Sequence, residues 1–271
     1  MSERRDERHD DKGALDLRSI TEAMAWDRVA EGYAGVISGH LVAYAEDALR
    51  LAEVSAEDTV VDVATGPGTL ALVASDVAAK VSALDFSAEM LEALRRRATP
   101  TQLERLELRQ GEGQALPFDD ASFDAAFSMF GLFMFPDRAR GFAELARVLR
   151  PGGRAVVASW QPQDQIPAFM TVIEELMREA GATPEGGQPL AQADDLREEM
   201  GAAGFEVEVD GATHTWRAPS FDVLWEGLQR SHVGLGIARD QLEAPRFSAL
   251  LARIETRLRE TQGEGPQEIT M

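Results

Sequence analysis

Three acidic side chains follow three successive apolar runs of the sequence. Asp62 ends the first run, inside the stretch DVATGPGTL of residues 62–70, Asp85 ends the second, and Glu112 comes shortly after the third. If these runs are parallel strands of one sheet, their carboxyl ends lie together at the edge where such sheets bind ligands. The three carboxylates then share one site, where they can accept hydrogen bonds from amines and hydroxyls.

The glycine-rich stretch alone permits three interpretations: a pyrophosphate turn, a turn that binds another nucleoside-like ligand, or a structural turn between a strand and a helix. A dinucleotide fingerprint reads G-x-G-x-x-G, so that backbone amides and a helix N-terminus meet the pyrophosphate. Here the spacing is A-T-G-P-G-T, with Ala64 in the first glycine position and Asp62 just before it. A carboxylate there disfavours a phosphate and favours a ligand that presents a cation.

The other two acids suit the nucleoside part of such a ligand. Asp85, placed after the second strand, can accept hydrogen bonds from both ribose hydroxyls. Glu112 can accept one from an adenine amine, while the amides of Gly113 and Gln114 face the ring edge. A nucleoside with an amine and a sulfonium, and without phosphate, matches all three acids. S-adenosylmethionine has these chemical groups.

The elements that must position these acids follow from periodicity and turn residues. We predict strands over residues 59–63, 81–84, 106–109, 123–129, 154–160 and 205–209, and a loop over 182–189. Helices are predicted over 69–79, from an N-cap at Ser87, and over 137–149, 166–180 and 195–203. Two helices broken near Gly32 or Gly35 are predicted over 22–54, and 220–262 is predicted helical with an interruption near Gly234 and Gly236.

This alternation of strands and helices predicts an α/β fold with right-handed crossovers. We expect a Rossmann-like, doubly wound, mostly parallel sheet with helices on both faces. N-terminal helices, an insertion after the fifth strand and C-terminal helices should form a helical cover.

Four segments carry a family resemblance: VVDVATGPGTLAL, SALDFSAEMLEAL, GEGQALPFDDASFD and a helix that ends RVLRPGG. Together and in this order they resemble the class I S-adenosylmethionine-dependent methyltransferases, in particular the ubiquinone/menaquinone-biosynthesis-type and related small-molecule branch. The resemblance covers about residues 22–215. It implies S-adenosylmethionine as the cofactor. It also implies a role for each of these residues: Asp62 for the methionine amine, Ala64, Gly66 and Gly68 for a close turn past the methionine, Tyr33 for its carboxylate, Asp85 for ribose, Phe86, Met90, Glu112, Gly113 and Gln114 for adenine, and Ser128 near the sulfur.

The sequence departs from the family pattern at several places. Ala64 replaces the usual first glycine and narrows the room at the cofactor, Gly113 replaces a common alanine, and Glu112 is longer than the usual aspartate. The family's sheet has a seventh strand that lies antiparallel between the fifth and the sixth. Either residues 268–271 begin that strand or it is truncated.

Methyl transfer from a sulfonium is an in-line displacement that needs alignment and exclusion of water. A protein nucleophile is not required, but a base helps when the acceptor is a phenol or an acidic carbon. His232, expected in a loop of the C-terminal helical region, is the first candidate base and His214 the second. His40 is as consistent with a surface position as with a pocket, and His9 is discounted because it lies in the N-terminal tail.

The aromatic run of residues 127–135 fits either a buried strand with its turn or the wall of an acceptor pocket. An apolar, aromatic wall favours an apolar or aromatic small-molecule acceptor. The candidate wall residues are Met129, Phe130, Phe133, Trp160 and Trp225. The fourth strand end lacks the Asn/Asp-Pro-Pro-aromatic motif of methyltransferases that act on nucleic acid or glutamine amines.

Composition excludes several classes of partner. The formal net charge is −20 and the arginines are dispersed, so phosphate backbones and anionic lipid surfaces are repelled. Cysteine is absent and the four histidines lack metal-ligand spacing, so we expect no metal site. The sequence shows neither a signal-peptide core nor a membrane-spanning apolar run. We therefore expect a cytoplasmic protein that binds neither nucleic acid nor a membrane.

We expect residues 1–20 to be a disordered charged tail and residues 21–271 to be a single methyltransferase domain. Within it, 22–54 form the N-terminal cover, 55–160 the cofactor-binding core, and 161–271 the acceptor-side helices, sixth strand and C-terminal segment. The predicted reaction is methyl transfer to oxygen or nitrogen rather than carbon. The alternatives are a non-catalytic cofactor-binding protein, a family member with another reaction and, less favoured, an NAD-dependent oxidoreductase. The oligomeric state stays open.

Overall fold

The computed structural model describes residues 15–161, 168–182 and 189–270. Its centre is a sheet of five parallel strands in the order β3-β2-β1-β4-β5. The strands are β1 (Thr59–Val63), β2 (Lys80–Asp85), β3 (Leu106–Gln110), β4 (Phe123–Met129) and β5 (Leu149–Ala158). The helices between them are α3 (Thr69–Val77), α4 (Ala88–Arg97), α5 (Pro100–Arg105) and α6 (Arg138–Val148). The predicted Rossmann-like α/β fold is confirmed.

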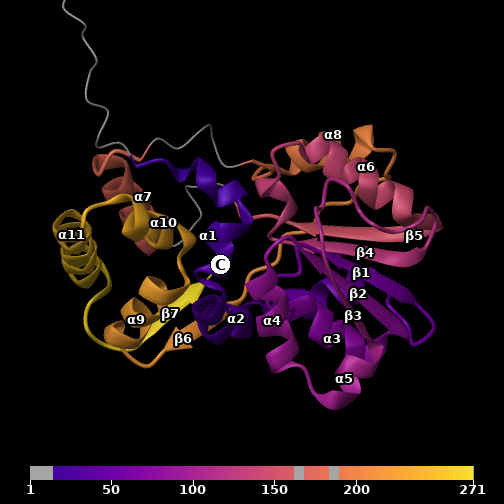
Figure 1. Ribbon diagram of the computed structural model, residues 1–271, viewed down its shortest axis with the longest axis horizontal. Coiled ribbons are helices and arrows are strands. Elements are labelled where there is room, and N and C mark those ends of the chain that lie inside the picture. Colours follow the sequence, from indigo (N-terminus) through magenta and orange to yellow (C-terminus); the bar gives the residue numbers. More distant parts are fainter. Residues whose placement is uncertain (1–14, 162–167, 183–188, 271) are drawn as a thin grey trace, which may run out of the picture.

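Successive strand residues point to opposite faces of the sheet, and each face has its own core. Val60 and Ala125 pack with α3 and with α2 (Ala30–Leu51). Val61 and Ala126 pack on the other side with α6 and with Met200 of α8 (Ala193–Ala202). Figure 1 shows α6 and α8 above the strands and α3 below them. The sheet is therefore covered on both faces, which explains why the central strands β1 and β4 are buried over almost their whole length.

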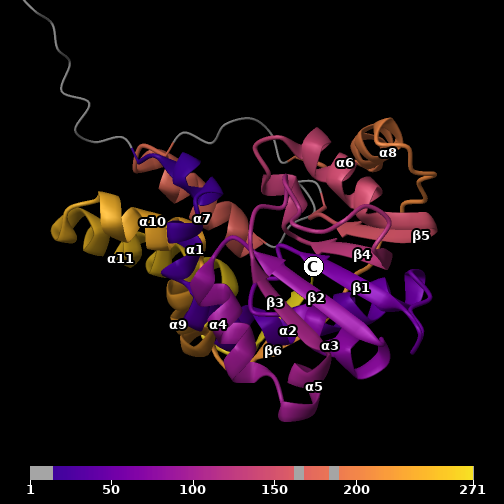
Figure 2. The ribbon, with the colours of Figure 1, turned by 45° about the vertical axis from the view of Figure 1, so that its right-hand side comes forward.

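A second group of elements lies beside the sheet and forms the helical cover (Figures 1 and 2). It comprises η1 (Leu17–Thr21), α1 (Ala23–Asp27), α7 (Ala168–Glu179), α9 (Phe221–Ser231), α10 (Val233–Gln241) and α11 (Ala244–Gln262). Their apolar side chains share one core, to which Leu15, Phe221 and Ile254 contribute as completely buried residues. Helix α2 packs against both α3 and α9, so it joins the cover to the sheet. Within the residues that the structure describes, no helix has the length and apolar character of a membrane span.

The prediction of a sixth sheet strand over residues 205–209 is wrong. Phe205 and Val207 pack against the core formed by α6 and α8, but no strand ladder includes this segment. The alternating apolar residues of this segment are explained by burial of one side of the chain, without backbone pairing to a strand. The observed β6 (Thr215–Ala218) pairs antiparallel with β7 (Gln267–Thr270) in a separate two-stranded sheet. The first expectation for the chain end is therefore wrong, because β7 is a strand but does not insert beside β5, and the described part of the main sheet has no seventh strand.

Two predicted helix breaks are also misplaced. Gly32 and Gly35 lie inside α2, and the break falls before it, at residues 28–29. Gly32 serves close packing instead, because a Cβ there would overlap the carbonyl oxygen of Arg230 on α9. Gly234 and Gly236 lie within α10, whose ends are set by His232 and by residues 242–243. Gly32 therefore marks a contact between helices rather than a helix end, whereas a Cβ at Gly35 would meet nothing within 4 Å.

Other boundaries differ less. Strand β5 begins at Leu149 rather than at residue 154, and residues 150–153 form an irregularity between its pairs with Phe123 and Ala125. Leu15 is completely buried and residues 17–21 form η1, so the predicted tail boundary at residue 20 is too late. Residues 1–14, the start of the predicted helix at 166, and most of the predicted loop over 182–189 lie outside the described residues. The predicted N-cap of α4 is confirmed, since Ser87 Oγ accepts a hydrogen bond from the Met90 amide.

Candidate active site

The turn after β1 brings three residues with positive φ to the carboxyl edge of the sheet: Ala64 at 57°, Gly66 at 55° and Gly68 at 79°. A Cβ at Gly68 would overlap Leu94 of α4, whereas a Cβ at Gly66 would meet nothing within 4 Å. Gly68 therefore serves packing, and Gly66 leaves open space at the strand ends. Ala64 holds the left-handed conformation without being glycine, which costs on the order of 1 kcal/mol.

Asp62 lies at the end of β1 and is 1% exposed. Its Oδ2 accepts hydrogen bonds from Thr65 Oγ1 at 2.6 Å and from the Ala71 amide at 3.2 Å. Burial raises the pKa of this carboxyl to about 7, and the two hydrogen bonds oppose the shift only in part. The charged form is thus costly in the free protein, and a cationic ligand group beside it would relieve that cost.

Asp85 holds the first two strand-end loops together. Its Oδ2 accepts from the Gly66 amide at 2.8 Å and its Oδ1 from the Ser87 amide at 2.9 Å. It is 4% exposed, and burial raises its pKa to about 6, with the Asp27 charge adding to the shift. The carboxylate is fixed at both oxygens, so it presents its remaining lone pairs in one direction.

The loop after β3 supplies the third wall. Glu112 is exposed at its surface, and a Cβ at Gly113 would overlap the ring of Phe135. Gln114 Oε1 accepts from the Asp137 amide at 2.6 Å, which ties this loop to the start of α6. The glycine at position 113 is therefore explained by the close approach of Phe135.

The N-terminal helices close the site from the side of the cover. Tyr33 of α2 makes an edge contact with Trp26 of α1, with ring centroids 6.0 Å apart. Burial, with the Asp85 charge as a second cause, raises the pKa of Tyr33 to about 12. Asp27 accepts hydrogen bonds from Ser87 Oγ and, at 3.2 Å, from the Glu89 amide, so α1 is anchored on the N-terminus of α4.

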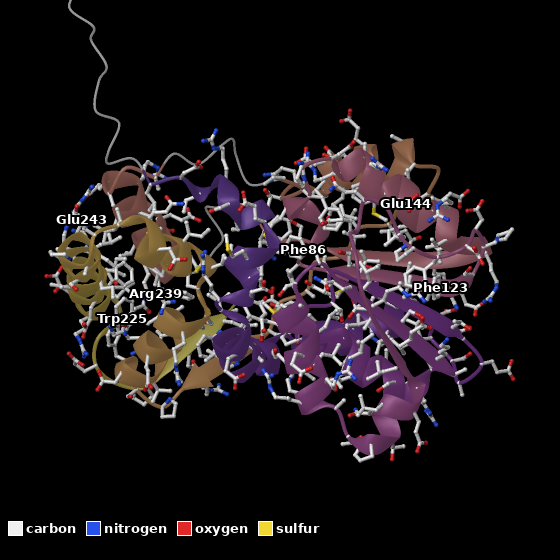
Figure 3. All side chains as sticks on the ribbon, viewed as in Figure 1. Phe86, Phe123, Glu144, Trp225, Arg239 and Glu243 are labelled. Atoms are coloured by element: carbon white, nitrogen blue, oxygen red, sulfur yellow. The ribbon has the colours of Figure 1, made fainter. Side chains whose placement is uncertain are left out.

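Two adjoining cavities result. The strand-end cavity, of about 200 Å³, is lined by the three strand-end loops and by Tyr33, and includes Asp62, Asp85 and Glu112 in its wall. The cover cavity, of about 1860 Å³, extends between α2, α7, α9, α10 and the edge of β5. Trp26, Tyr33, Met129 and Phe130 line both. Figure 3 shows Phe86, a strand-end residue, between the sheet and the cover.

Aromatic rings form the wall of the cover cavity next to this junction. Phe130 stacks on Trp160 with centroids 4.0 Å apart and meets Tyr44 edge-on at 5.5 Å. Met129 and Phe133 pack against the same cluster. This wall can accept a planar, apolar group directly beside the strand-end cavity.

Comparison with known proteins decides the family. A family model described as a methyltransferase domain matches residues 61–157. The demethylmenaquinone methyltransferase of Thermus thermophilus is 32% identical over 203 residues, which are 69% of this chain and 86% of that protein. The enzyme of the same name from Deinococcus radiodurans is 32% identical over 193 residues, 63% of this chain and 75% of that one. The chain belongs to the class I S-adenosylmethionine-dependent methyltransferases.

Solved structures agree on the fold of this methyltransferase. The [4+2]-cyclase SpnF is 18% identical with a TM-score of 0.58, covering 95% of this chain and 96% of that one. The YcgJ protein of Bacillus subtilis is 20% identical with a TM-score of 0.52, covering 83% and 94%. The predicted family, the cofactor S-adenosylmethionine, and methyl transfer to a small-molecule acceptor are confirmed.

The strand-end cavity of the methyltransferase fits this cofactor. Buried carboxylates at Asp62 and Asp85 suit an ammonium group and ribose hydroxyls, and open space at Gly66 lets a ligand approach the backbone. Phe86 and Met90 lie on the same wall and offer apolar surface to an adenine ring. When bound, S-adenosylmethionine supplies a methyl group activated by the sulfonium. The chain's own task is to orient both ligands and to exclude water.

The structure brings most of the predicted site residues together. The predicted cofactor residues on the wall of the strand-end cavity are Tyr33, Asp62, Ala64, Gly66, Asp85, Phe86, Met90, Glu112, Gly113 and Gln114. The predicted acceptor residues on the wall of the cover cavity are Met129, Phe130, Phe133 and Trp160.

Three predicted residues lie behind these walls. Gly68 packs against Leu94. Ser128 is completely buried and its Oγ accepts a hydrogen bond from the Leu132 amide at 3.2 Å, so it holds the turn after β4. Trp225 lies in the core of the cover, as Figure 3 shows, and does not reach the cavity wall because the neighbouring Leu224 faces it instead.

The two candidate bases differ in position. His232 lines the cover cavity at the N-terminus of α10, whereas His214 lies outside both walls with its Nε2 2.8 Å from Asp47 Oδ2. That hydrogen bond holds the pKa of Asp47 below its ordinary value. His40 stacks on Trp216 with centroids 3.9 Å apart and faces the cover cavity, and burial lowers its pKa. His9 lies outside the described residues.

Several wall residues were not predicted. Thr65 supports Asp62 through its hydroxyl, and its place three residues after the acid was a usable signal. Trp26, Tyr44 and Trp216 carried no comparable signal. Helical spacing places Tyr44 on the apolar face of α2 but cannot show what that face meets.

Proposed function

We propose that this methyltransferase methylates a small hydroxylated aromatic acceptor of the phenol or hydroquinone type. The observation that carries the proposal is the aromatic wall of Phe130, Trp160 and Tyr44, which adjoins the strand-end cavity. Offset or stacked rings of this kind favour a planar acceptor. The names of the relatives, demethylmenaquinone methyltransferases, support the same class, since a quinone ring is planar and apolar.

The extent of the cover cavity supports an acceptor that carries an apolar substituent. Beside charged residues such as Arg178, the cavity lining beyond the aromatic wall includes the apolar side chains of Phe169, Ile173, Leu224 and Leu228 from α7 and α9. These side chains offer little to a charged metabolite and favour an alkyl or prenyl group on the ring. The methyl group then goes to the ring oxygen or to a ring carbon that this oxygen activates.

The test is turnover with a matched acceptor panel. The protein is incubated with S-adenosylmethionine and 1,4-dihydroxynaphthalene, its 2-alkyl derivative, aniline or glycine, and S-adenosylhomocysteine release and product mass are measured. We expect methylated product from the dihydroxynaphthalenes, with a lower KM for the alkylated one, and NMR of the product locates the methyl group. Turnover restricted to the amines, in a protein that binds S-adenosylhomocysteine normally, would contradict the proposal.

A further inference from the structure

The cover cavity contains a histidine whose ring is held in one protonation state. We propose that His232 is a fixed hydrogen-bond donor that orients an oxygen atom of the acceptor, and that it does not act as a general base. The proposal rests on the proposed function for the acceptor's class, a ring that carries oxygen. It assigns the substrate-orienting role to the Nε2–H group.

The local backbone sets the tautomer. His232 is the N-cap of α10, and its Nδ1 accepts a hydrogen bond from the Leu235 amide at 3.3 Å. A backbone N–H can only donate, so Nδ1 carries no proton and the neutral imidazole must carry it on Nε2. One ring nitrogen is therefore committed to the helix end, and the other is a donor.

The ring also stays neutral under ordinary conditions. Burial lowers the pKa of His232 to about 4, and a hydrogen bond with its own backbone opposes this shift. With Nδ1 engaged and Nε2 protonated, the neutral ring has no free lone pair to take a proton from the acceptor. The prediction that His232 serves as the base is thus disfavoured by the geometry of the cap.

The position of His232 allows its N–H group to reach the molecule that accepts the methyl group. His232 lines the cover cavity, and the next residue, Val233, packs against Val29 and Met90. Met90 lines the strand-end cavity, and Tyr33 of the same cluster lines both. His232 therefore lines the cavity that adjoins the strand-end cavity, and it precedes a residue of the cluster whose Trp26 and Tyr33 line both.

Among the described residues, no group is recorded that accepts a hydrogen bond from His232 Nε2, and this nitrogen is not sealed from the cavity. A donor in a largely apolar cavity gains most from a partner that arrives with the ligand, because water is excluded at that moment. An oxygen on the aromatic ring is such a partner. An unsubstituted ring offers none.

Two substitutions separate this role from that of the helix cap. His232→Ser keeps a side-chain oxygen for the Leu235 amide, since serine is a good N-cap, but removes the donor. His232→Asn keeps both a capping oxygen and an N–H donor. We expect the serine variant to lose about tenfold in kcat/KM for the hydroxylated acceptor, and the asparagine variant to recover part of that loss. Affinity for S-adenosylhomocysteine should stay within about twofold in both, because His232 does not line the strand-end cavity.

The tautomer is measured separately on the unmodified full-length protein. Nitrogen-15 spectra of histidine-labelled protein, with His232→Ser for assignment, should show Nε2 protonated and Nδ1 unprotonated at pH 7. A proton on Nδ1, or unchanged acceptor kinetics in a folded serine variant, would overturn the inference. Failure of the unmodified protein to methylate any hydroxylated aromatic acceptor would instead overturn the proposed function, so the two failures are distinct.

Discussion

The two walls of the site are built by different means. On the cofactor side, Asp62 and Asp85 stand at strand ends, and backbone amides of the neighbouring loops hold their oxygens. On the acceptor side, aromatic side chains and His232 project from helices and loops that are far apart in the sequence. One wall is polar and fixed by hydrogen bonds, and the other is apolar and fixed by packing.

The acceptor wall depends on close contacts between helices at glycine. Gly32 of α2 faces the carbonyl of Arg230 on α9, Gly227 of α9 faces Val36, and Gly236 of α10 faces Val29. These glycines let α9 and α10 approach α2 and its N-cap Val29 closely, because they add no side chain of their own at the contact. The comparison teaches that loss of a carboxylate charge should disturb the cofactor wall alone, whereas added volume at one of these three glycines should disturb the acceptor wall.

The largest expected effect is on the cofactor wall. Asp85→Ala removes the acceptor for the Gly66 and Ser87 amides as well as the proposed ribose contact. Loss of hydrogen bonds to a charged group corresponds to about 1.5–3 kcal/mol, or roughly a 10- to 150-fold weaker affinity for S-adenosylhomocysteine. Isothermal titration calorimetry measures this affinity. Asp194→Ala, at an exposed carboxylate on α8, is the control, and equal affinities in the two variants would refute the assignment.

The next effect concerns the cover. Gly32→Ala would place its Cβ against the backbone of Arg230, which cannot move aside as a side chain can. Overpacking of this kind costs typically about 1–3 kcal/mol of unfolding free energy, so the melting temperature should fall.

The same helix provides the matched control. Gly39 is exposed on α2 and a Cβ there meets nothing within 4 Å. Gly39→Ala should therefore stabilise the protein by about 0.5–1 kcal/mol, because alanine is the better helix former. If both variants shift the melting temperature in the same direction, the close contact between α2 and α9 does not carry the packing that we infer.

The two walls also differ in how well the sequence predicts them. The cofactor wall is local: each acid directly follows its own strand, and the rule for parallel sheets brings the strand ends together. Asp62 and Asp85 therefore lie where the sequence predicts. The sequence does not show why a particular residue stands at a particular position of this wall. Position 113, for example, must be glycine because Phe135 approaches it closely.

The acceptor wall depends on tertiary packing that periodicity does not encode. Trp225 was predicted to line it but faces the core of the cover, whereas Trp216, nine residues earlier in the chain, lines it. Gly32 was predicted to break a helix, because a glycine that permits helix contact and one that ends a helix are identical in the sequence. The alternating pattern at 205–209 predicted a strand for a similar reason, since burial on one face does not specify a backbone partner.

The third prediction is a pH dependence that belongs to the cofactor wall. The pKa of Asp62 is raised to about 7 and that of Asp85 to about 6, both by burial. Below pH 7 the Asp62 carboxyl of the free protein is protonated and cannot pair with a ligand ammonium. Affinity for S-adenosylhomocysteine should therefore rise by up to about tenfold per unit between pH 5.5 and 7, and then level off.

The free protein should show the opposite trend in stability. Because the folded-state pKa values exceed the unfolded ones, the folded state binds more protons between about pH 4 and 7, and stability from these groups falls as pH rises through that range. Asp62→Asn should flatten both the affinity and the stability profiles. A profile of Asp62→Asn that matches the unmodified protein would show that another group titrates.

The smallest expected effect tests the acceptor wall without touching the cofactor. Trp160→Leu removes the ring that stacks on Phe130 and leaves an apolar side chain in its place. An aromatic pair contributes about 0.5–1.5 kcal/mol beyond its buried area, so KM for a hydroxylated aromatic acceptor should rise by a factor of about 2 to 10. Trp160 lies outside the strand-end cavity, so affinity for S-adenosylhomocysteine should not change. Steady-state kinetics and calorimetry on the same preparation measure both quantities, and a parallel loss of the two would mean that the walls are coupled rather than separately built.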